Sequence, residues 1–231
     1  MKNALLIHSF SWLLVLIIPL LLIIGSITIL TTSSYLSFEY AKPGFPLDLF
    51  GFTSQERLEH ASDNLRYIRQ RLPASFLEQQ NHQGQPLYNS REISHMVDVQ
   101  LVFQAAWNAG KFLLVLALFL TTAITWREEN RSLFFSSVQQ GGIFSAGLTT
   151  IVGLLAVLSW NAWFTTFHQF FFQPGTWTFE TTDTLIRLFP LPFWFDGALT
   201  VSGLTLSAGI LLAVLGRFFM KRAAANARIQ E

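Results

Sequence analysis

Three long runs without a charged residue dominate this sequence. Ala4–Leu30 contains 27 residues with no Asp, Glu, Lys or Arg, Ser132–Phe179 contains 48, and Gly197–Gly216 contains 20. A helix of about 20 apolar residues is long enough to span the hydrocarbon core of a bilayer. A fourth apolar segment reaches this length when it is taken as residues 101–126, which include Lys111. The pattern predicts an all-α membrane protein with four transmembrane helices.

The composition supports this class and excludes others. Hydrophobic residues make up 51% of the chain and charged residues only 13%, and the mean hydropathy is +0.41. A formal net charge of +1 provides no basic surface for nucleic acid. The chain has no cysteine, which excludes disulfides, thiolate metal sites and a cysteine nucleophile.

Short segments between spans predict the orientation, because long loops cross a membrane regardless of their charge. Positive residues lie before the first span at Lys2, after the second at Arg127 and Arg131, and in the tail from Arg217 onwards. With four spans, all of these segments fall on one side. The positive-inside rule therefore predicts that both termini are cytoplasmic.

The first run is too long for the apolar region of a cleaved signal peptide, and no small-residue cleavage motif follows it. We therefore expect it to be retained as a helix. The expected plan has transmembrane helices at 4–31, 101–126, 141–165 and 197–217, an extracytoplasmic domain at 32–100, a cytoplasmic loop at 127–140, an extracytoplasmic loop at 166–196 and a cytoplasmic tail at 218–231.

The domain between the first two spans is expected to be small and mostly helical. Thr53 and Glu56 form a capping box at the head of a helix, and Pro73 ends it. The polar side chains of this helix, among them Arg57 and Asn64, are expected to form a solvated face, and residues 74–89 to be mostly loop. An apolar stripe with alternating spacings of three and four follows the cap: Leu58, Ala61, Leu65, Ile68 and Leu72.

Two histidines fall at one predicted depth, the outer surface of the membrane. His95 precedes the second span and His168 follows the third. Arg91 and Asp98 share a helical face with His95, and Asp98 can orient or charge-stabilise its imidazole. A short loop joins spans two and three, so these helices are expected to be antiparallel neighbours. A single interfacial histidine is more often a hydrogen-bonding residue than a catalyst, but ionisable groups at membrane depth are functional candidates.

At these residues the sequence resembles a family of bacterial integral membrane proteins that includes the lipoprotein intramolecular transacylase (Lit). The resemblance covers nearly the whole chain, and the order, the spacing and the four-span plan all agree. The matching segments are Gly51–Arg57, Asn64–Ile68, Arg91–Val99, Phe167–Phe171 and Trp177–Phe179.

The resemblance implies a transferase. Such an enzyme moves the sn-2 acyl chain of a diacylglyceryl-modified lipoprotein to the amino group of its own N-terminal cysteine, which gives a lyso-form lipoprotein. The implied partners are that lipoprotein and membrane lipid. The resemblance makes His95 and His168 the expected catalytic pair. Supporting or substrate-binding roles are expected for Asp98, Arg91, Trp177 and Tyr67.

This chemistry needs proton transfer but no cofactor and no metal. An α-amine has a pKa of about 8, so it must lose a proton to attack an ester, and the leaving glyceryl oxygen must gain one. A histidine can do either. The amine and the ester belong to one molecule and need only be held together, so no acyl-enzyme is required.

Three other functions remain open at this point. The two histidines could be axial ligands of a b-type haem. The Thr53–Leu72 helix could be the contact surface of a non-enzymatic binding or assembly module. A lipid hydrolase would use the same histidines with water as the acceptor. The oligomeric state cannot be predicted from this sequence.

Overall fold

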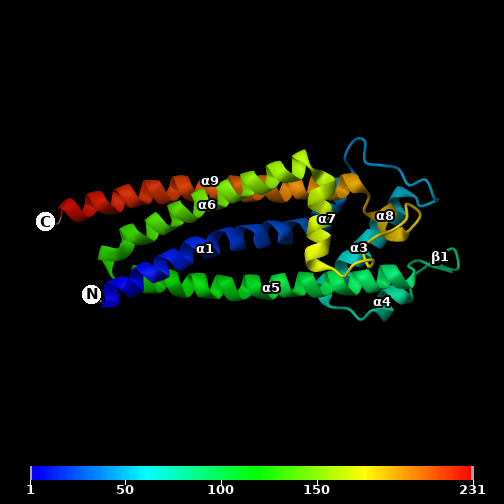
Figure 1. Cartoon of the computed structure of the whole chain (residues 1–231), viewed down its shortest axis with the longest axis horizontal. Helices are drawn as coiled ribbons and strands as arrows, with labels where there is room; N and C mark the ends of the chain where they lie inside the picture. Colours follow the sequence, from blue (N-terminus) through cyan, green and yellow to red (C-terminus); the bar gives the residue numbers. More distant parts are fainter. Residues whose placement is uncertain (1, 230–231) are drawn as a thin grey trace. The chain divides into compact units, whose positions relative to one another are not determined.

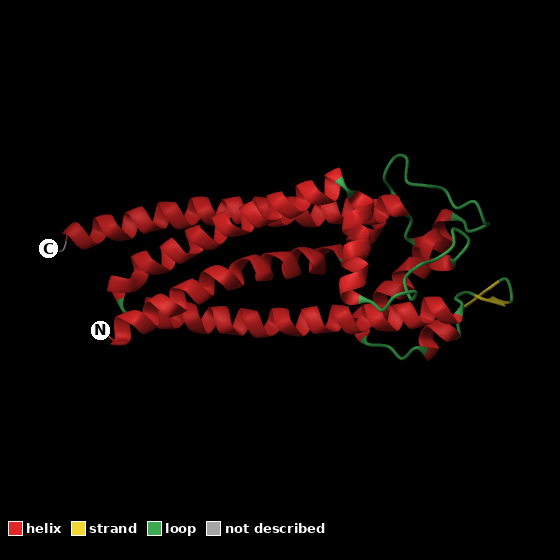
Figure 2. Ribbon diagram, in the orientation of Figure 1, coloured by secondary structure: helices red, strands yellow, loops and turns green. Residues whose placement is uncertain are grey.

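The computed structural model describes residues 2–229, with side chains over residues 4–223, and most of the chain is helical (Figures 1 and 2). Two short strands form an antiparallel hairpin in which Asn81 pairs with Pro86. The elements in order are α1 Lys2–Leu30, α2 Ser33–Tyr40, α3 Ser54–Gln70, α4 Ser75–Glu78, β1 Asn81–His82, β2 Gln85–Pro86, α5 Ser90–Thr125, η1 Glu128–Asn130, α6 Arg131–Leu158, α7 Trp160–Phe171, α8 Thr184–Leu188 and α9 Leu191–Ile229.

Four helices are long and apolar enough to cross a membrane, which confirms the predicted fold class. Their hydropathy comes from runs of Leu, Ile, Val, Ala and Phe that satisfy their backbone hydrogen bonds internally, as a bilayer requires. The spans are Ala4–Leu30, Ser90–Thr125, Glu128–Leu158 and Leu191–Ala223.

The bounds of the helices differ from those of the spans expected from hydropathy. The expected loop at 127–140 is mostly helical, because α6 already begins at Arg131. The second span was expected to begin at residue 101, but α5 begins at Ser90. The third was expected to continue to residue 165, but α6 ends at Leu158 and a separate helix follows. Hydropathy identifies the residues that can lie in the hydrocarbon core of a bilayer. A helix can continue past that core, because its backbone hydrogen bonds do not depend on apolar side chains. The last two residues of the expected tail lie outside the described residues.

The chain divides into two compact units. Unit 1 comprises the residues up to Ser26, Asn108–Leu154 and the residues from Thr200 onwards, and unit 2 comprises Ile27–Trp107 and Leu155–Leu199. Unit 1 is built from parts of α1, α5, α6 and α9, and its core cluster contains Leu14, Ile17, Ile18, Leu120 and Ile124.

Small and hydroxyl-bearing residues hold the helices of unit 1 together. A Cβ at Gly142 would lie 2.5 Å from both the backbone nitrogen of Ala213 and the backbone oxygen of Gly209, so α6 and α9 touch backbone to backbone there. The hydroxyl groups of Ser26 and Thr205 hydrogen bond at 3.0 Å between α1 and α9. Lipid provides no hydrophobic drive for helix association, and close packing with interhelical hydrogen bonds takes its place.

Unit 2 has its own hydrophobic core, formed mainly by residues of the domain between the first two spans. Tyr67 from α3 and Leu188 from α8 are among its most buried side chains, at 1% and 0% exposure. The expected capping box is present, since the Thr53 side chain accepts from the Glu56 backbone and Glu56 accepts from the Thr53 backbone. The cluster comprises Phe52, Tyr67, Leu77, Leu87, Tyr88, Met96, Leu185 and Leu188.

The prediction that Arg57 and Asn64 belong to a solvated face is wrong. Both are buried, at 4% and 2% exposure. The Arg57 guanidinium donates to the carbonyl oxygens of Pro46 and Arg187, and the Asn64 amide donates to the hydroxyl of Tyr88. Burial of a polar group is tolerated when its hydrogen bonds are made, and these partners lie on other elements.

Candidate active site

The structure brings His95 and His168 together within unit 2. His95 lies near the start of α5 and His168 near the end of α7. Their ring centroids are 6.4 Å apart, and the ring planes differ by only 18°. The two imidazole planes are therefore nearly parallel, and the rings are close enough to act on one substrate.

A backbone hydrogen bond fixes the tautomer of His168. Its Nδ1 lies 2.8 Å from the carbonyl oxygen of Phe164, one turn earlier on α7. A carbonyl oxygen can only accept, so Nδ1 must carry the proton. In a neutral ring the other nitrogen, Nε2, is then the acceptor. Nε2 of neutral His168 is therefore the nitrogen that can accept a proton.

Aromatic side chains surround the pair. The Phe172 ring centroid lies 5.0 Å from that of His95 and 5.5 Å from that of His168. On the His168 side, Phe164 and Trp177 lie 4.0 Å and 4.9 Å away. Such a wall excludes water, which strengthens hydrogen bonds and charge interactions inside the site.

Two buried nitrogens in this region have no hydrogen-bond partner among the described residues. One is Nδ1 of His95, a residue that is only 9% exposed. The other is the indole Nε1 of Trp177, whose ring contacts His168. Buried polar atoms are nearly always paired, and an exception calls for an explanation such as a catalytic role.

Burial lowers the pKa of His168 below the usual value for histidine, and the hydrogen bond to the Phe164 carbonyl partly opposes this shift because it favours the protonated ring. His168 is therefore neutral near pH 7. A neutral imidazole is the form that can take a proton from an attacking amine.

The other candidate residues are placed differently. Among the described residues no hydrogen bond or ion pair joins Arg91 to either histidine. Arg91 forms an ion pair with Asp183 at 2.9 Å, and its guanidinium lies 5.5 Å from the Phe179 ring centroid. In the described part of the chain, no hydrogen bond or ion pair joins Asp98 to His95, whose Nδ1 is unpartnered. Tyr67 belongs to the core of unit 2.

Sequence reasoning missed several residues of the site. Phe164 supplies the carbonyl that orients His168, and Phe172 contacts both imidazoles. Phe179 packs 5.3 Å from His95. The spacing of four between Phe164 and His168 was a usable signal, because residues four apart are neighbours on a helix. No local pattern could have identified Asp183 as the partner of Arg91.

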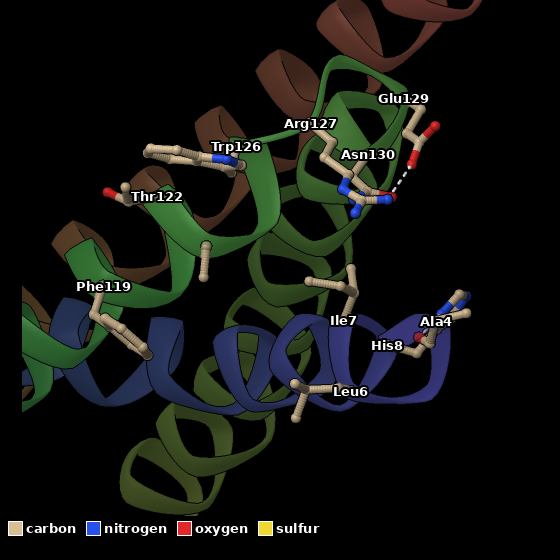
Figure 3. Close-up of a pocket in the computed structure, with 11 residues that line it drawn as sticks. Ala4, Leu6, Ile7, His8, Phe119, Thr122, Trp126, Arg127, Glu129 and Asn130 are labelled. Atoms are coloured by element: carbon tan, nitrogen blue, oxygen red, sulfur yellow. Dashed lines mark hydrogen bonds and ion pairs between the residues drawn. The ribbon is translucent and has the colours of Figure 1, made fainter. Parts of the chain in front are cut away.

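A metal site and a groove were the two other candidate sites, and neither offers a comparable set of reactive side chains. No group of three or more His, Asp or Glu residues in the described chain could hold a metal ion. A groove with a volume of about 520 Å³ lies in unit 1, where the start of α1 meets the end of α5 (Figure 3). At its rim, Arg127 is paired with Glu129 and His8 is bonded to the Ala4 carbonyl. The groove contains none of the candidate residues.

The fold and the paired histidines define an integral membrane protein with four membrane-spanning helices and a candidate acid–base site. A sequence model of the family described as lipoprotein intramolecular transacylase Lit matches residues 12–194. The chain therefore belongs to this family of acyltransferases.

Relatives and solved structures agree with this assignment. An uncharacterized protein of Aquifex aeolicus (strain VF5) is 31% identical over 225 residues, covering 91% of this chain and 96% of that protein. The membrane-integral lipoprotein intramolecular transacylase Lit from Bacillus cereus has a TM-score of 0.79 at 15% identity, covering 96% of this chain and 99% of the other. A variant of that protein has a TM-score of 0.72 at 15% identity, covering 100% and 97%. The two structures establish the fold.

Proposed function

We propose that this protein moves the sn-2 acyl chain of a diacylglyceryl-cysteine lipoprotein to the N-terminal amine of the same molecule. The product is a lyso-form lipoprotein. The single observation that carries the proposal is the stacking of His95 and His168, 6.4 Å apart, in a chain of the transacylase family. Two imidazoles at this separation can serve an amine and an ester oxygen that belong to one substrate.

The proton route follows from the tautomer of His168. Its Nε2 takes the proton lost by the amine as nitrogen attacks the ester carbonyl. As the new C–N bond forms, the ester C–O bond breaks, and the histidine pair returns one proton to the glyceryl oxygen. One proton has then moved from nitrogen to oxygen, and no acyl group has been attached to the protein. Holding both groups of one substrate together supplies much of the rate enhancement.

A hydrogen-bond donor is also needed for the oxygen that becomes negative during attack. The indole N–H of Trp177 is buried without a partner and belongs to a ring in contact with His168. We assign the supporting role to this residue rather than to Arg91, because the Arg91 guanidinium is held by Asp183. Asp98 and Tyr67 are not needed for the proposed steps.

The proposed location is the bacterial cytoplasmic membrane, with the active site on the extracytoplasmic side. Support comes from the charges near the turn between the second and third spans, where Arg127 follows α5 and Arg131 is the first residue of α6. His95 lies near the start of α5, at the end of the second span opposite to Arg127. A lipid-modified lipoprotein is anchored where such a site can reach both its ester and its amine.

A b-type haem fits this arrangement poorly. The Phe172 ring contacts both imidazoles and therefore lies beside the space between them. A haem coordinated by both histidines would need that space for its macrocycle. A colourless purified protein, without a Soret band, is the expected result.

The test is co-expression with a diacylglyceryl lipoprotein, followed by mass spectrometry of its N-terminal peptide. We expect one acyl chain on the amine, one on the glyceryl group and no loss of mass. A hydrolase would instead release a free fatty acid and leave the amine unmodified. Unchanged diacylglyceryl lipoprotein in every combination would refute the proposed reaction.

A further inference from the structure

The helix that carries His168 does not continue the third span. Ser159 has φ −147° and ψ 58°, outside the helical region, and separates α6 from α7. The following helix runs crosswise to the Ser90–Trp107 part of α5 within unit 2 (Figures 1 and 2). The last residues of α6 are still apolar and exposed, with Leu158 79% exposed. The helix is therefore interrupted at Ser159, directly after the exposed apolar residues at the end of α6.

The side chains of α7 are divided between two faces. At 3.6 residues per turn, its aromatic residues occupy one arc of about 120°, and Phe170 on that arc is 81% exposed. His168 lies at the edge of the arc, between the aromatic and polar faces. The aromatic residues are Trp160, Trp163, Phe164, Phe167, Phe170 and Phe171. The polar face carries Thr165, Thr166 and Gln169, and Asn161 lies at its edge on the side of His168.

Neighbouring rings of the aromatic arc lie against one another along the helix. The ring centroids of Trp160 and Trp163 are 5.3 Å apart, those of Trp163 and Phe167 5.7 Å, and those of Phe167 and Phe171 4.9 Å. No charged residue occurs between Ser132 and Phe179. An uncharged helix with this division, rich in Trp, is typical of a segment lying in the polar–apolar boundary of a bilayer.

We infer that α7 lies flat in this boundary, with the exposed residues of its aromatic arc, Phe167, Phe170 and Phe171, among lipid acyl chains, and that it thereby sets the depth of His168. An interfacial helix buries its apolar face about 5–10 Å into the boundary between headgroups and acyl chains. A residue at the edge of the apolar arc then lies at the level of the glyceryl esters. The part of the inference concerning the ester rests on the proposed function, whereas the position of the helix does not.

The absence of cysteine makes the inference directly testable. Phe170→Cys, Asn161→Cys and Gln169→Cys each place a single nitroxide label on α7, at the apolar face, at the edge near His168 and at the polar face. The full chain is reconstituted in phosphatidylethanolamine–phosphatidylglycerol vesicles. Accessibility to oxygen and to a water-soluble nickel chelate then reports the depth of each label by electron paramagnetic resonance.

We expect the label at 170 to be deepest, the label at 161 intermediate and the label at 169 in water. If all three labels are open to the nickel chelate, α7 does not lie in the membrane. If the label at 170 is shielded from both reagents, protein or a second copy of the chain covers the aromatic arc, and the inference fails. Phe171→Cys replaces Phe170→Cys if the latter does not fold.

A second measurement connects depth to activity. Phe170→Glu places a charge among acyl chains, which is unfavourable, and we expect at least a tenfold loss of lyso-form product. Phe170→Leu and Gln169→Glu should retain activity, because they preserve the apolar and polar faces. Equal activity in all three would refute the functional part of the inference. The label depths are read without any reaction, so a failure of the proposed function leaves them interpretable.

Discussion

His168 donates a hydrogen bond from Nδ1 to the carbonyl oxygen of Phe164, 2.8 Å away. Because both residues belong to α7, the helix itself determines which ring nitrogen remains basic. The stacked ring of His95, 6.4 Å from His168, provides the second proton carrier. The first two predictions follow from this arrangement.

Replacing either histidine by alanine should reduce formation of lyso-form lipoprotein by at least about 100-fold, since general acid–base help contributes about 10²–10⁴-fold. Mass spectrometry of the co-expressed lipoprotein measures the product. Asp98→Asn is the matched control, and it should retain most activity because no hydrogen bond or ion pair joins Asp98 to His95 in the described chain. Product at the parental rate from both histidine variants would show that the pair is not catalytic.

The His168 imidazole should titrate below its ordinary value of 6.5, because burial lowers its pKa. The folded protein then binds fewer protons than the unfolded chain between the two pKa values, so the free energy of unfolding should fall as pH drops below about 6.5. Nuclear magnetic resonance of labelled histidines in micelles measures the pKa, and the signal lost in His168→Ala gives the assignment. A pKa above 6.5 would contradict the burial argument.

Removing one partner of the largely buried ion pair between Asp48 and Arg187 should strongly destabilise the fold. The Asp48 side chain is 1% exposed, bonds the guanidinium at 2.9 and 3.0 Å, and accepts from the backbone of Phe52 at 2.8 Å. Asp48→Ala leaves the Arg187 guanidinium, whose side chain is only 13% exposed, without its carboxylate partner. Such a loss typically costs about 3–5 kcal/mol. Unfolding in mixed micelles measures the loss.

A more exposed ion pair provides the control for this prediction. Arg91 is 45% exposed in its pair with Asp183, and such pairs contribute about 0–1 kcal/mol. Arg91→Ala should therefore change the free energy of unfolding much less than Asp48→Ala does. Similar losses in the two variants would mean that burial does not distinguish these pairs.

The contact of α6 with α9 should not tolerate a side chain at Gly142. A Cβ there would lie 2.5 Å from backbone atoms of both Gly209 and Ala213, which cannot rotate away. Overpacking typically costs about 1–3 kcal/mol, so Gly142→Ala should lower the melting temperature in detergent. Gly147→Ala on the same helix is the control, because nothing lies within 4 Å of a Cβ at that position.

The sequence by itself determined the four spans and the fold class, because hydropathy is a local property of about 20 consecutive residues. It also identified His95 and His168 as a candidate pair, because each lies beside an apolar run whose end can be estimated. The capping box of Thr53 and Glu56 was equally readable, since both partners lie within four residues of each other.

Only the tertiary structure decided which polar residues are buried and which are paired. Arg57 is buried because carbonyl oxygens of Pro46 and Arg187 accept its hydrogen bonds, and Arg187 lies 130 positions along the chain. Arg91 pairs with Asp183, 92 positions away, instead of reaching the histidines. Helical periodicity relates residues within a few turns and contains no information on such partners. The depth of a residue is therefore readable from its neighbours in sequence, but its partner depends on how distant segments pack.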